Sequence, residues 1–149
     1  MTNGFDMSGL PDPERDVRFY ERILSKRLLA WVIDFAILIV LTLIAGLFSF
    51  FALLFVLPFT MFAISTVYRA LMISNYGATL GMQITNIEIR NSSGELLDQK
   101  TAWWHSGTFS AMFLIPILPI IGAIVMLTTR YKQGLHDLPF GTTAIIRSS

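Results

Sequence analysis

Two charged side chains, Arg27 and Asp34, stand at the start of a long apolar run and are the first candidates for chemistry in this chain. They are seven residues apart, so on a helix Asp34 lies about 10.5 Å deeper than Arg27 and on nearly the same face. That distance rules out a direct ion pair. A carboxylate inside a membrane-spanning helix costs about 2.5–3.5 kcal/mol, so Asp34 needs a partner from another segment.

The nature of that partner separates two interpretations of Asp34. A basic side chain, hydroxyl groups, backbone amides or water could each meet the carboxylate. The functional interpretation is an ion or proton relay, or a ligand contact, because intramembrane carboxylates often have such roles. The alternative is a structural polar contact that fixes how the helices pack. The sequence leaves both interpretations open.

Near the C-terminus, Asp137 is a candidate partner for Arg27, which would otherwise anchor its helix at the membrane interface. His105 and His136 are expected at the surface, because two histidines without clustered carboxylates make a weak metal site. The sequence has no Ser-His-Asp spacing, no phosphate-binding loop and no pair of catalytic carboxylates. We therefore expect no catalytic residue, no metal and no cofactor, and a protein that is not an enzyme.

The composition indicates the surroundings in which this chain folds. Of its 149 residues, 54% are hydrophobic and 14% are charged. A soluble domain is about 45–50% apolar and about 25% charged. Lipid bilayer is therefore the expected partner, and an integral membrane protein is the expected class. The net charge of +1 argues against nucleic-acid binding, and the absence of cysteine excludes disulfides and thiolate chemistry.

The N-terminal part of the chain is polar. Residues 1–17 mix glycine and proline with charges and predict a flexible arm. Residues 18–27 have an amphipathic pattern, which fits either a short interfacial helix or a plain extension of the first spanning helix. A polar start of mixed charge does not resemble a signal peptide, so the helices themselves are expected to enter the membrane.

Residues 28–68 carry a single charge, Asp34, in an otherwise largely apolar run. A membrane span takes about 20 residues, so this run predicts two helices, at about 28–47 and 51–72. Glycine and serine interrupt the aliphatic residues between them, as expected for a tight turn. Pro58 would lie inside the second helix and kink it.

A third apolar segment covers residues 101–129. Near its start lie Trp103 and Trp104, which suit the headgroup level of a membrane. With Pro116 and Pro119 near its middle, it could cross once or form a short hairpin broken at these prolines. The positive-inside rule favours the hairpin, because it leaves every basic residue in the cytoplasm. These residues are Arg15, Arg18, Arg22, Lys26, Arg27, Arg69, Arg90, Lys100, Arg130, Lys132 and Arg147.

The remaining segments predict a small β element outside the membrane. Residues 82–98 alternate between apolar and polar side chains, with a slip near Asn86, and predict a strand, a turn and a short returning strand. Residues 142–147 are also strand-like. In the hairpin arrangement they could pair with the first strand, which would cover edges that are otherwise open.

Three stretches, RLLAWVID, YGATLGMQITNIEI and QGLHDLPFGTTAII, together resemble the RDD family of membrane proteins over residues 20–147. The arginine and two aspartates that name the family are here Arg27, Asp34 and Asp137, its G-x-T-x-G element is Gly77, Thr79 and Gly81, and its closing strand is Gly141 to Ile146. Many relatives carry basic residues where this chain has Met82 and WWHS. A basic, amphipathic lead-in helix is therefore not expected.

With this resemblance, the expected fold is an all-α integral membrane domain over residues 18–149. It consists of a transmembrane helical hairpin, the proline-broken third apolar segment and the small β element. The family implies transport of ions or small ligands, for which Asp34 would be the titrating group. The alternative is an accessory or assembly subunit bound laterally to a larger membrane complex. We expect the chain to form a homo-oligomer or part of a larger complex. We expect it in a prokaryotic cytoplasmic membrane, with its N-terminus in the cytoplasm.

Overall fold

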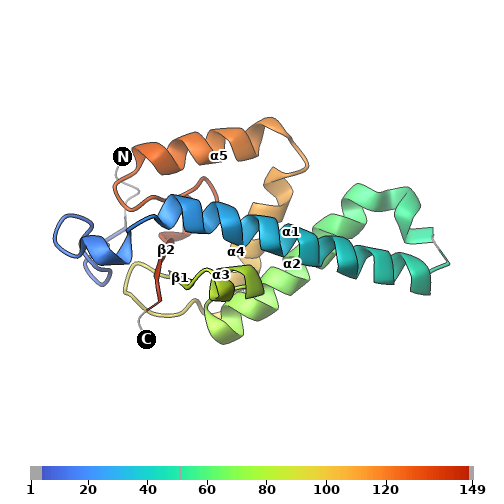
Figure 1. The fold of residues 1–149 in the computed structure, drawn as a ribbon, viewed down its shortest axis with the longest axis horizontal. Coiled ribbons are helices and arrows are strands. Elements are labelled where there is room, and N and C mark those ends of the chain that lie inside the picture. The colour runs from blue at the N-terminus through green and yellow to red at the C-terminus, as the bar shows by residue number, and fades with distance from the viewer. Residues whose placement is uncertain (1–4, 51, 148–149) are drawn as a thin grey trace.

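Two long helices lie side by side along the molecule, in a computed structural model that describes residues 5–50 and 52–147 (Figure 1). They are α1 (Ile23–Phe48) and α2 (Leu57–Tyr76). At a rise of about 1.5 Å per residue they are about 39 and 30 Å long, which matches the hydrocarbon core of a bilayer. Both are long and apolar enough to cross a membrane.

The first helix begins earlier than its apolar run. Residues from Ile23 onwards extend α1 without a break, and only Val17–Phe19 forms a separate 3₁₀ turn, η1. The second half of the amphipathic segment, residues 23–27, is therefore an extension of the first long helix, as one of the two interpretations held, whereas its first half is η1 and a turn. A helix can begin among polar residues here because Ile23 and Ala30 bury its first turns against the rest of the molecule.

The second helix corrects the expected boundaries. Ala52–Val56 forms a short 3₁₀ helix, η2, and α2 begins only at Leu57. Pro58 thus lies in the first turn of α2 instead of its interior, and the kink expected there is wrong. A proline in a first turn lacks only an N–H that would have no partner inside the helix, so the position suits it.

The third apolar segment is broken, as the prolines predicted. It forms α4 (Gln99–Met112) and α5 (Ile117–Thr128), which are bent by 117°. Pro116 is the N-cap of α5, and Pro119 follows within its first turn. The arms are about 21 and 18 Å long, shorter than a bilayer core of about 30 Å. The described residues thus hold two candidate spans, or three if the bent pair counts as one.

The β element is a two-stranded antiparallel sheet of β1 (Ile87–Arg90) and β2 (Thr143–Ile146). The register runs from Ile87 opposite Ile146 to Arg90 opposite Thr143. This confirms the pairing expected between the two strand-like segments, which are far apart in sequence.

Two parts of the predicted β element are wrong. A short helix, α3 (Leu80–Ile84), occupies the start of the predicted strand, and the returning strand near residues 96–98 does not form. Asn86, where the pattern slips, has a left-handed backbone with φ of 61°, which separates α3 from β1. Asp98 instead caps α4, because its side chain accepts a hydrogen bond from the Thr101 amide.

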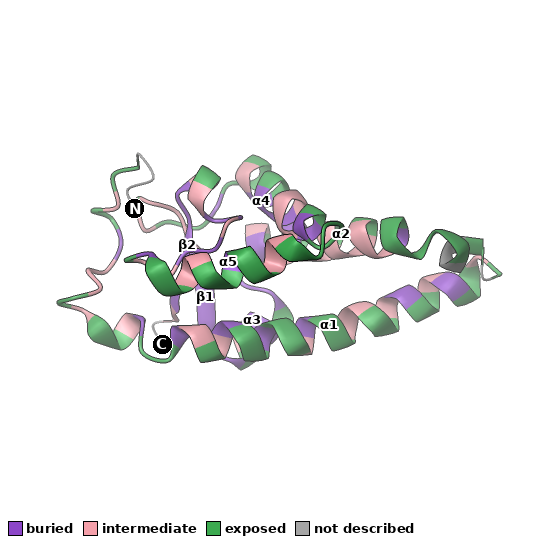
Figure 2. Ribbon diagram, turned by 90° about the horizontal axis from the view of Figure 1, so that it is seen from above, coloured by how far each residue is buried: buried purple, intermediate pink, exposed green. Residues whose placement is uncertain are grey.

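The buried residues gather around α3 and the two strands, whereas the far ends of α1 and α2 are largely exposed (Figure 2). Ile73, Ile87 and Ile89 are fully buried there. Each such side chain contributes about 1.5–3 kcal/mol on burial. At the other end, Phe48 and Phe55 are 81% and 91% exposed. An apolar surface of this kind is typical of a helix pair in contact with lipid.

The N-terminal segment contacts the folded part over its described residues, although a flexible arm was expected. Leu10 is buried, and the Tyr20 hydroxyl donates to the carbonyl of Pro11. Arg130 forms an ion pair with Asp12 at 3.2 Å. Residues 1–4 lie outside the described part of the chain.

The sheet register can be checked by cross-linking, since the chain has no cysteine of its own. Opposed residues of an antiparallel pair lie about 4.5–5.5 Å apart between Cα atoms, within the range that a disulfide spans. The double variant Arg90→Cys, Thr143→Cys should therefore form a disulfide on mild oxidation, seen as a mobility shift in non-reducing electrophoresis. Arg90→Cys with Ala144→Cys is the control, because neighbouring residues face opposite sides of a strand. Equal cross-linking of both pairs would contradict the register.

Candidate functional site

Asp34 is held by three hydrogen-bond donors from two other elements. The hydroxyl of Thr79 donates to Oδ2 at 2.6 Å, and the amide of Gly81 donates to Oδ1 at 2.9 Å. The hydroxyl of Tyr68 on α2 also donates to Oδ1 at 2.9 Å. Among the described residues, no cation lies within 4.0 Å of this carboxylate. Its partners are hydroxyls and an amide, as one of the open alternatives held.

The G-x-T-x-G residues form the turn that brings these donors to Asp34. Gly77 ends α2 with a φ of 71°, a conformation that glycine adopts most readily. Thr79 is the N-cap of α3, where its side chain accepts from the Met82 amide while its hydroxyl donates to Asp34. Gly81 packs so closely on α1 that a Cβ would overlap the carbonyl oxygen of Ala30. The motif therefore fastens α3 onto α1.

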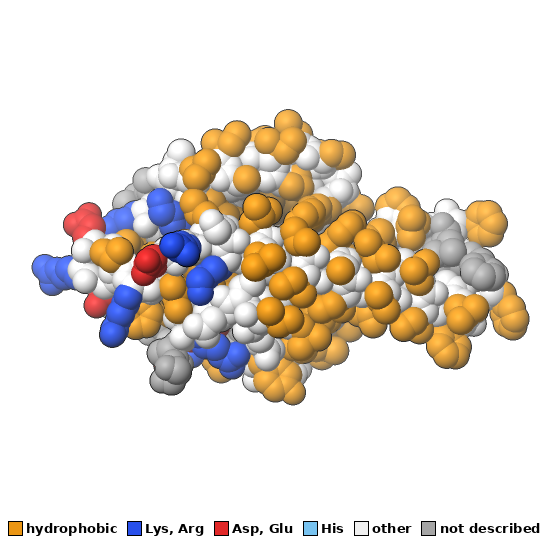
Figure 3. Space-filling model, viewed as in Figure 1, with side chains coloured by type: hydrophobic (Ala, Val, Ile, Leu, Met, Phe, Trp, Pro, Cys, Tyr) orange, Lys and Arg blue, Asp and Glu red, His pale blue; other side chains and the backbone are white. Residues whose placement is uncertain are grey.

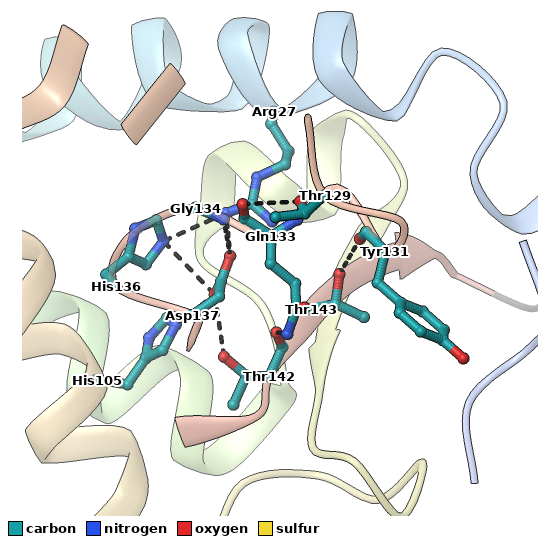
Figure 4. A network of polar contacts seen from close by, with 10 residues as sticks. All are labelled: Arg27, His105, Thr129, Tyr131, Gln133, Gly134, His136, Asp137, Thr142 and Thr143. Carbon is teal, nitrogen blue, oxygen red and sulfur yellow. Dashed lines mark hydrogen bonds and ion pairs between the residues drawn. The ribbon is translucent and has the colours of Figure 1, made fainter. Parts of the chain in front are cut away.

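Asp137 is the centre of a second polar cluster and pairs with Arg27, as the sequence predicted (Figure 4). Nη2 of Arg27 lies 2.9 Å from Oδ2 of Asp137. The Gly134 amide donates to the same oxygen, and the Thr142 hydroxyl donates to Oδ1 at 3.0 Å. Gly141 lets the chain turn between these residues, with a φ of 62° after the 3₁₀ helix η3 (Leu138–Phe140).

Both histidines are buried in this second cluster, so the expectation that they lie at the surface is wrong. Nε2 of His105 lies 2.8 Å from Oδ1 of Asp137, and Nε2 of His136 lies 3.2 Å from Nη2 of Arg27. Single-sequence patterns cannot foresee this burial, because His105 comes from α4 and His136 from the loop that precedes β2.

Burial and charge shift the titration of the loop residues of this cluster. Desolvation lowers the pKa of His136 well below its usual value, which keeps the imidazole neutral. Burial alone would raise the pKa of Asp137, but the charge of Arg27, the electrostatic influence of His136 and the hydrogen bond from His105 hold it well below its usual range. Asp137 is therefore ionised at neutral pH and completes a buried ion pair with Arg27.

His105, His136 and Asp137 could offer three ligand atoms within 4.8 Å of one another. The arrangement does not suit a divalent cation, because the Arg27 guanidinium lies within hydrogen-bond distance of both Asp137 and His136. Its positive charge would repel the ion, and the Asp137 oxygens already accept several hydrogen bonds. The cluster fits an internal ion pair better than a metal centre.

Arg69 is a buried charge, although its sequence position predicts a basic residue on the cytoplasmic side of the membrane. It lies within α2, with 4% of its surface exposed. Its guanidinium stacks over the ring of Phe109 on α4, with 3.7 Å between its central carbon and the ring centroid. Sequence reasoning could place Arg69 inside the predicted second helix but could not foresee its burial, because the covering ring of Phe109 belongs to α4.

Two cavities meet between the helices. Their volumes are about 310 and 410 Å³, and neither is fully enclosed. The first lies among residues of α1, α2 and α4, and the second reaches between α1 and α5. Among the described residues, five line both cavities: Trp31, Asp34, Arg69, Phe109 and Phe113. Asp34 and Arg69 are thus the charged residues at the junction of two mainly apolar spaces.

A family model described as the RDD family matches residues 23–141, most of the chain. The chain belongs to the RDD family. The match includes the charged residues of both clusters in this RDD protein, and also the turn at Gly77 to Gly81. No curated protein and no solved structure is similar enough to the chain to count as a match.

The close approach of α3 to α1 leads to a stability prediction. Gly81→Ala would place a methyl group against backbone and against the Asp34 carboxylate, neither of which can easily move. We expect this variant to lose about 1–3 kcal/mol of stability, measured as a lower midpoint in thermal unfolding in detergent. Gly107→Ala on α4 is the matched control, since its Cβ would meet only the Thr66 methyl group at 3.9 Å. Equal midpoints for the two variants would contradict the contact.

The second cluster leads to a prediction on pH. Because His136 has a lower pKa folded than unfolded, the unfolded chain binds more protons below pH 6.5. The folded state should therefore lose stability as the pH falls from about 6.5, and Asp137 should add to the loss only below its ordinary pKa of 3.8. His136→Gln should reduce the dependence of the unfolding midpoint on pH between about pH 6.5 and 5. An unchanged slope between pH 6.5 and 5 would show that His136 is not buried as a neutral group.

Proposed function

We propose that this RDD protein transports an ion or a small ligand, with Asp34 and Arg69 as its charged centre. The observation that carries the proposal is the junction of the two cavities at these two residues. Charged side chains are costly inside a membrane domain and commonly mark a path for ions or ligands. The apolar walls with few polar groups also match the usual lining of a ligand site.

The proposal includes an orientation in the prokaryotic cytoplasmic membrane. Charged side chains gather at the end of the molecule that holds both described ends of the chain, and hydrophobic side chains cover the helices beyond it (Figure 3). By the positive-inside rule, this charged end would lie in the cytoplasm. The short arms α4 and α5 would then enter and leave from the same side as a re-entrant pair.

Cysteine labelling tests this orientation. With a membrane-impermeant maleimide added to intact cells, Phe48→Cys at the exposed end of α1 should be labelled. Glu95→Cys, in the exposed loop after β1, should be labelled only after the cells are broken. Labelling of the Glu95→Cys variant in intact cells would contradict the cytoplasmic placement of the sheet.

Two long helices are few for enclosing a path across a bilayer, so the proposal also requires a homo-oligomer or a larger complex. The alternative role of an accessory subunit makes a different prediction for purification in mild detergent. An accessory subunit would leave the membrane with a stoichiometric partner of different mass. A transporter that works as a homo-oligomer would contain copies of this chain alone, as native mass spectrometry would show.

Flux measurements test the transport proposal directly. The protein would be reconstituted in vesicles that contain a pH-sensitive dye, and proton movement would be followed after an ion gradient is imposed. Asp34→Asn keeps the shape of the side chain but removes its charge, so we expect flux to fall to the level of empty vesicles. Asp98→Asn is the control, because Asp98 is exposed and lines neither cavity. Equal flux in the Asp34→Asn variant and the wild type would contradict a role for this carboxylate.

A further inference from the structure

Arg69 is a charged residue that lines both cavities and has two buried nitrogen atoms without a hydrogen-bond partner. Within the described part of the chain, its Nε and Nη2 have no hydrogen-bond partner, although the side chain is almost fully buried. A buried guanidinium normally meets a carboxylate or several acceptors, because an unpaired buried charge is costly. The stacking on Phe109 covers one face of the guanidinium plane but does not use its N–H groups.

The other charges that line the cavities already have partners. Asp34 accepts from Tyr68, Thr79 and Gly81, so its oxygens are occupied. The charge of Arg27 is neutralised by the fully buried Asp137 at 2.9 Å, although its Nη1 has no hydrogen-bond partner among the described residues. The donors that remain for a ligand at the junction are therefore the N–H groups of the Arg69 guanidinium, and an anionic acceptor suits them best.

The free edge of Arg69 also indicates the shape of the ligand's charged group. Nε and Nη2 lie on the same side of the guanidinium, and their N–H bonds can point in parallel to two oxygens. This fork matches a carboxylate or a phosphate group, which accept in a bidentate manner. A halide ion or a single carbonyl would use only part of this edge.

The walls around Arg69 indicate the rest of the ligand. Trp31, Phe109 and Phe113 line both cavities, and the second cavity continues along Met112 and Leu127 toward α5. Apolar walls of this kind favour an apolar body over a small hydrated anion. Volumes of about 310 and 410 Å³ lie at the lower end of the range for small-molecule sites.

We propose that the paired cavities bind an amphipathic organic anion, whose carboxylate or phosphate group lies on the Nε and Nη2 edge of Arg69 and whose apolar chain lies along the aromatic walls. This inference rests on the proposed function, because it names the ligand class of the same cavities. The charged group could belong to a free single-chain acid or to the headgroup of an acidic phospholipid. Both sources present the same chemistry to Arg69.

Binding of radiolabelled decanoate to the purified, immobilised protein tests the inference in a scintillation-proximity assay. Arg69→Gln should weaken binding about tenfold or more, since it removes a charge-assisted bidentate contact. Arg130→Gln is the matched control, because its side chain is 51% exposed and lines neither cavity. Unlabelled decyltrimethylammonium has the same chain with the opposite charge and should fail to compete.

Two further variants keep the test valid if Arg69→Gln does not fold. Arg69→Lys retains the charge but not the two-pronged edge, and it should bind decanoate with an affinity between those of the wild type and the glutamine variant. Ala123→Phe would fill part of the second cavity from α5 and should also weaken binding. Size-exclusion chromatography checks that each variant is folded.

Competition with phospholipids separates the two sources of the anion. Displacement of decanoate by phosphatidylglycerol, but not by phosphatidylcholine, would assign the site to a lipid headgroup. Displacement by unlabelled decanoate alone would assign it to a free acid. Either result supports the inference.

Three results would overturn the inference: no decanoate binding to the folded wild type, unchanged binding in a folded Arg69→Gln variant, or equal competition by the cation. If decanoate does not bind but flux still depends on Asp34, the ligand class is wrong and the transport proposal stands. Conversely, Arg69-dependent binding without any flux contradicts transport and leaves the ligand site standing.

Discussion

The arrangement of this protein depends on compensating charges that are buried among apolar helices. A carboxylate or guanidinium in such surroundings must find partners from the protein, since bulk water cannot supply them. Helix α1 carries two such groups, Arg27 and Asp34, about two turns apart. Each is met by a different segment from far along the chain, so two long-range contacts hold the rest of the domain to one helix.

These two contacts also explain the small sheet. Asp34 fastens the turn at Thr79 and Gly81, and β1 begins shortly after that turn. Arg27 fastens Asp137, and β2 begins shortly after it. Since both strands start from points held on neighbouring parts of α1, they are brought together in antiparallel register. The second cluster thus stabilises a pairing that two four-residue strands would not achieve alone.

Asp34 and Arg69 line the same cavities but differ in how many of their hydrogen-bonding groups have partners. Asp34 accepts hydrogen bonds from two hydroxyls and an amide. These bonds hold α2 and α3 against α1, so Asp34 has a structural role in addition to the one proposed in transport. Arg69 stacks on Phe109, and its Nε and Nη2 have no hydrogen-bond partner among the described residues. In the RDD protein described here, the residue named by the family motif therefore shapes the cavities, and a residue outside the motif offers them a charge.

The sequence by itself determined the features that depend on neighbouring residues. Apolar runs and their lengths located the long helices, and Pro116 located the break between α4 and α5. Asp137 was singled out by the RDD pattern and as an acidic residue that could pair with Arg27. By contrast, Pro58 was misjudged, because helix ends depend on local turns such as η2 that hydropathy does not reveal.

Only the tertiary structure decided the rest, because those features depend on contacts between residues far apart in the chain. Residues 82–84 begin the alternating, strand-like pattern but belong to helix α3, since Thr79 caps that helix and Gly81 fits against α1. His105 and His136 are buried because α4 and the loop before β2 meet at Asp137, 110 residues from Arg27. Arg69 resembles an interfacial charge in sequence, and it is the packing of α4 on α2 that buries it.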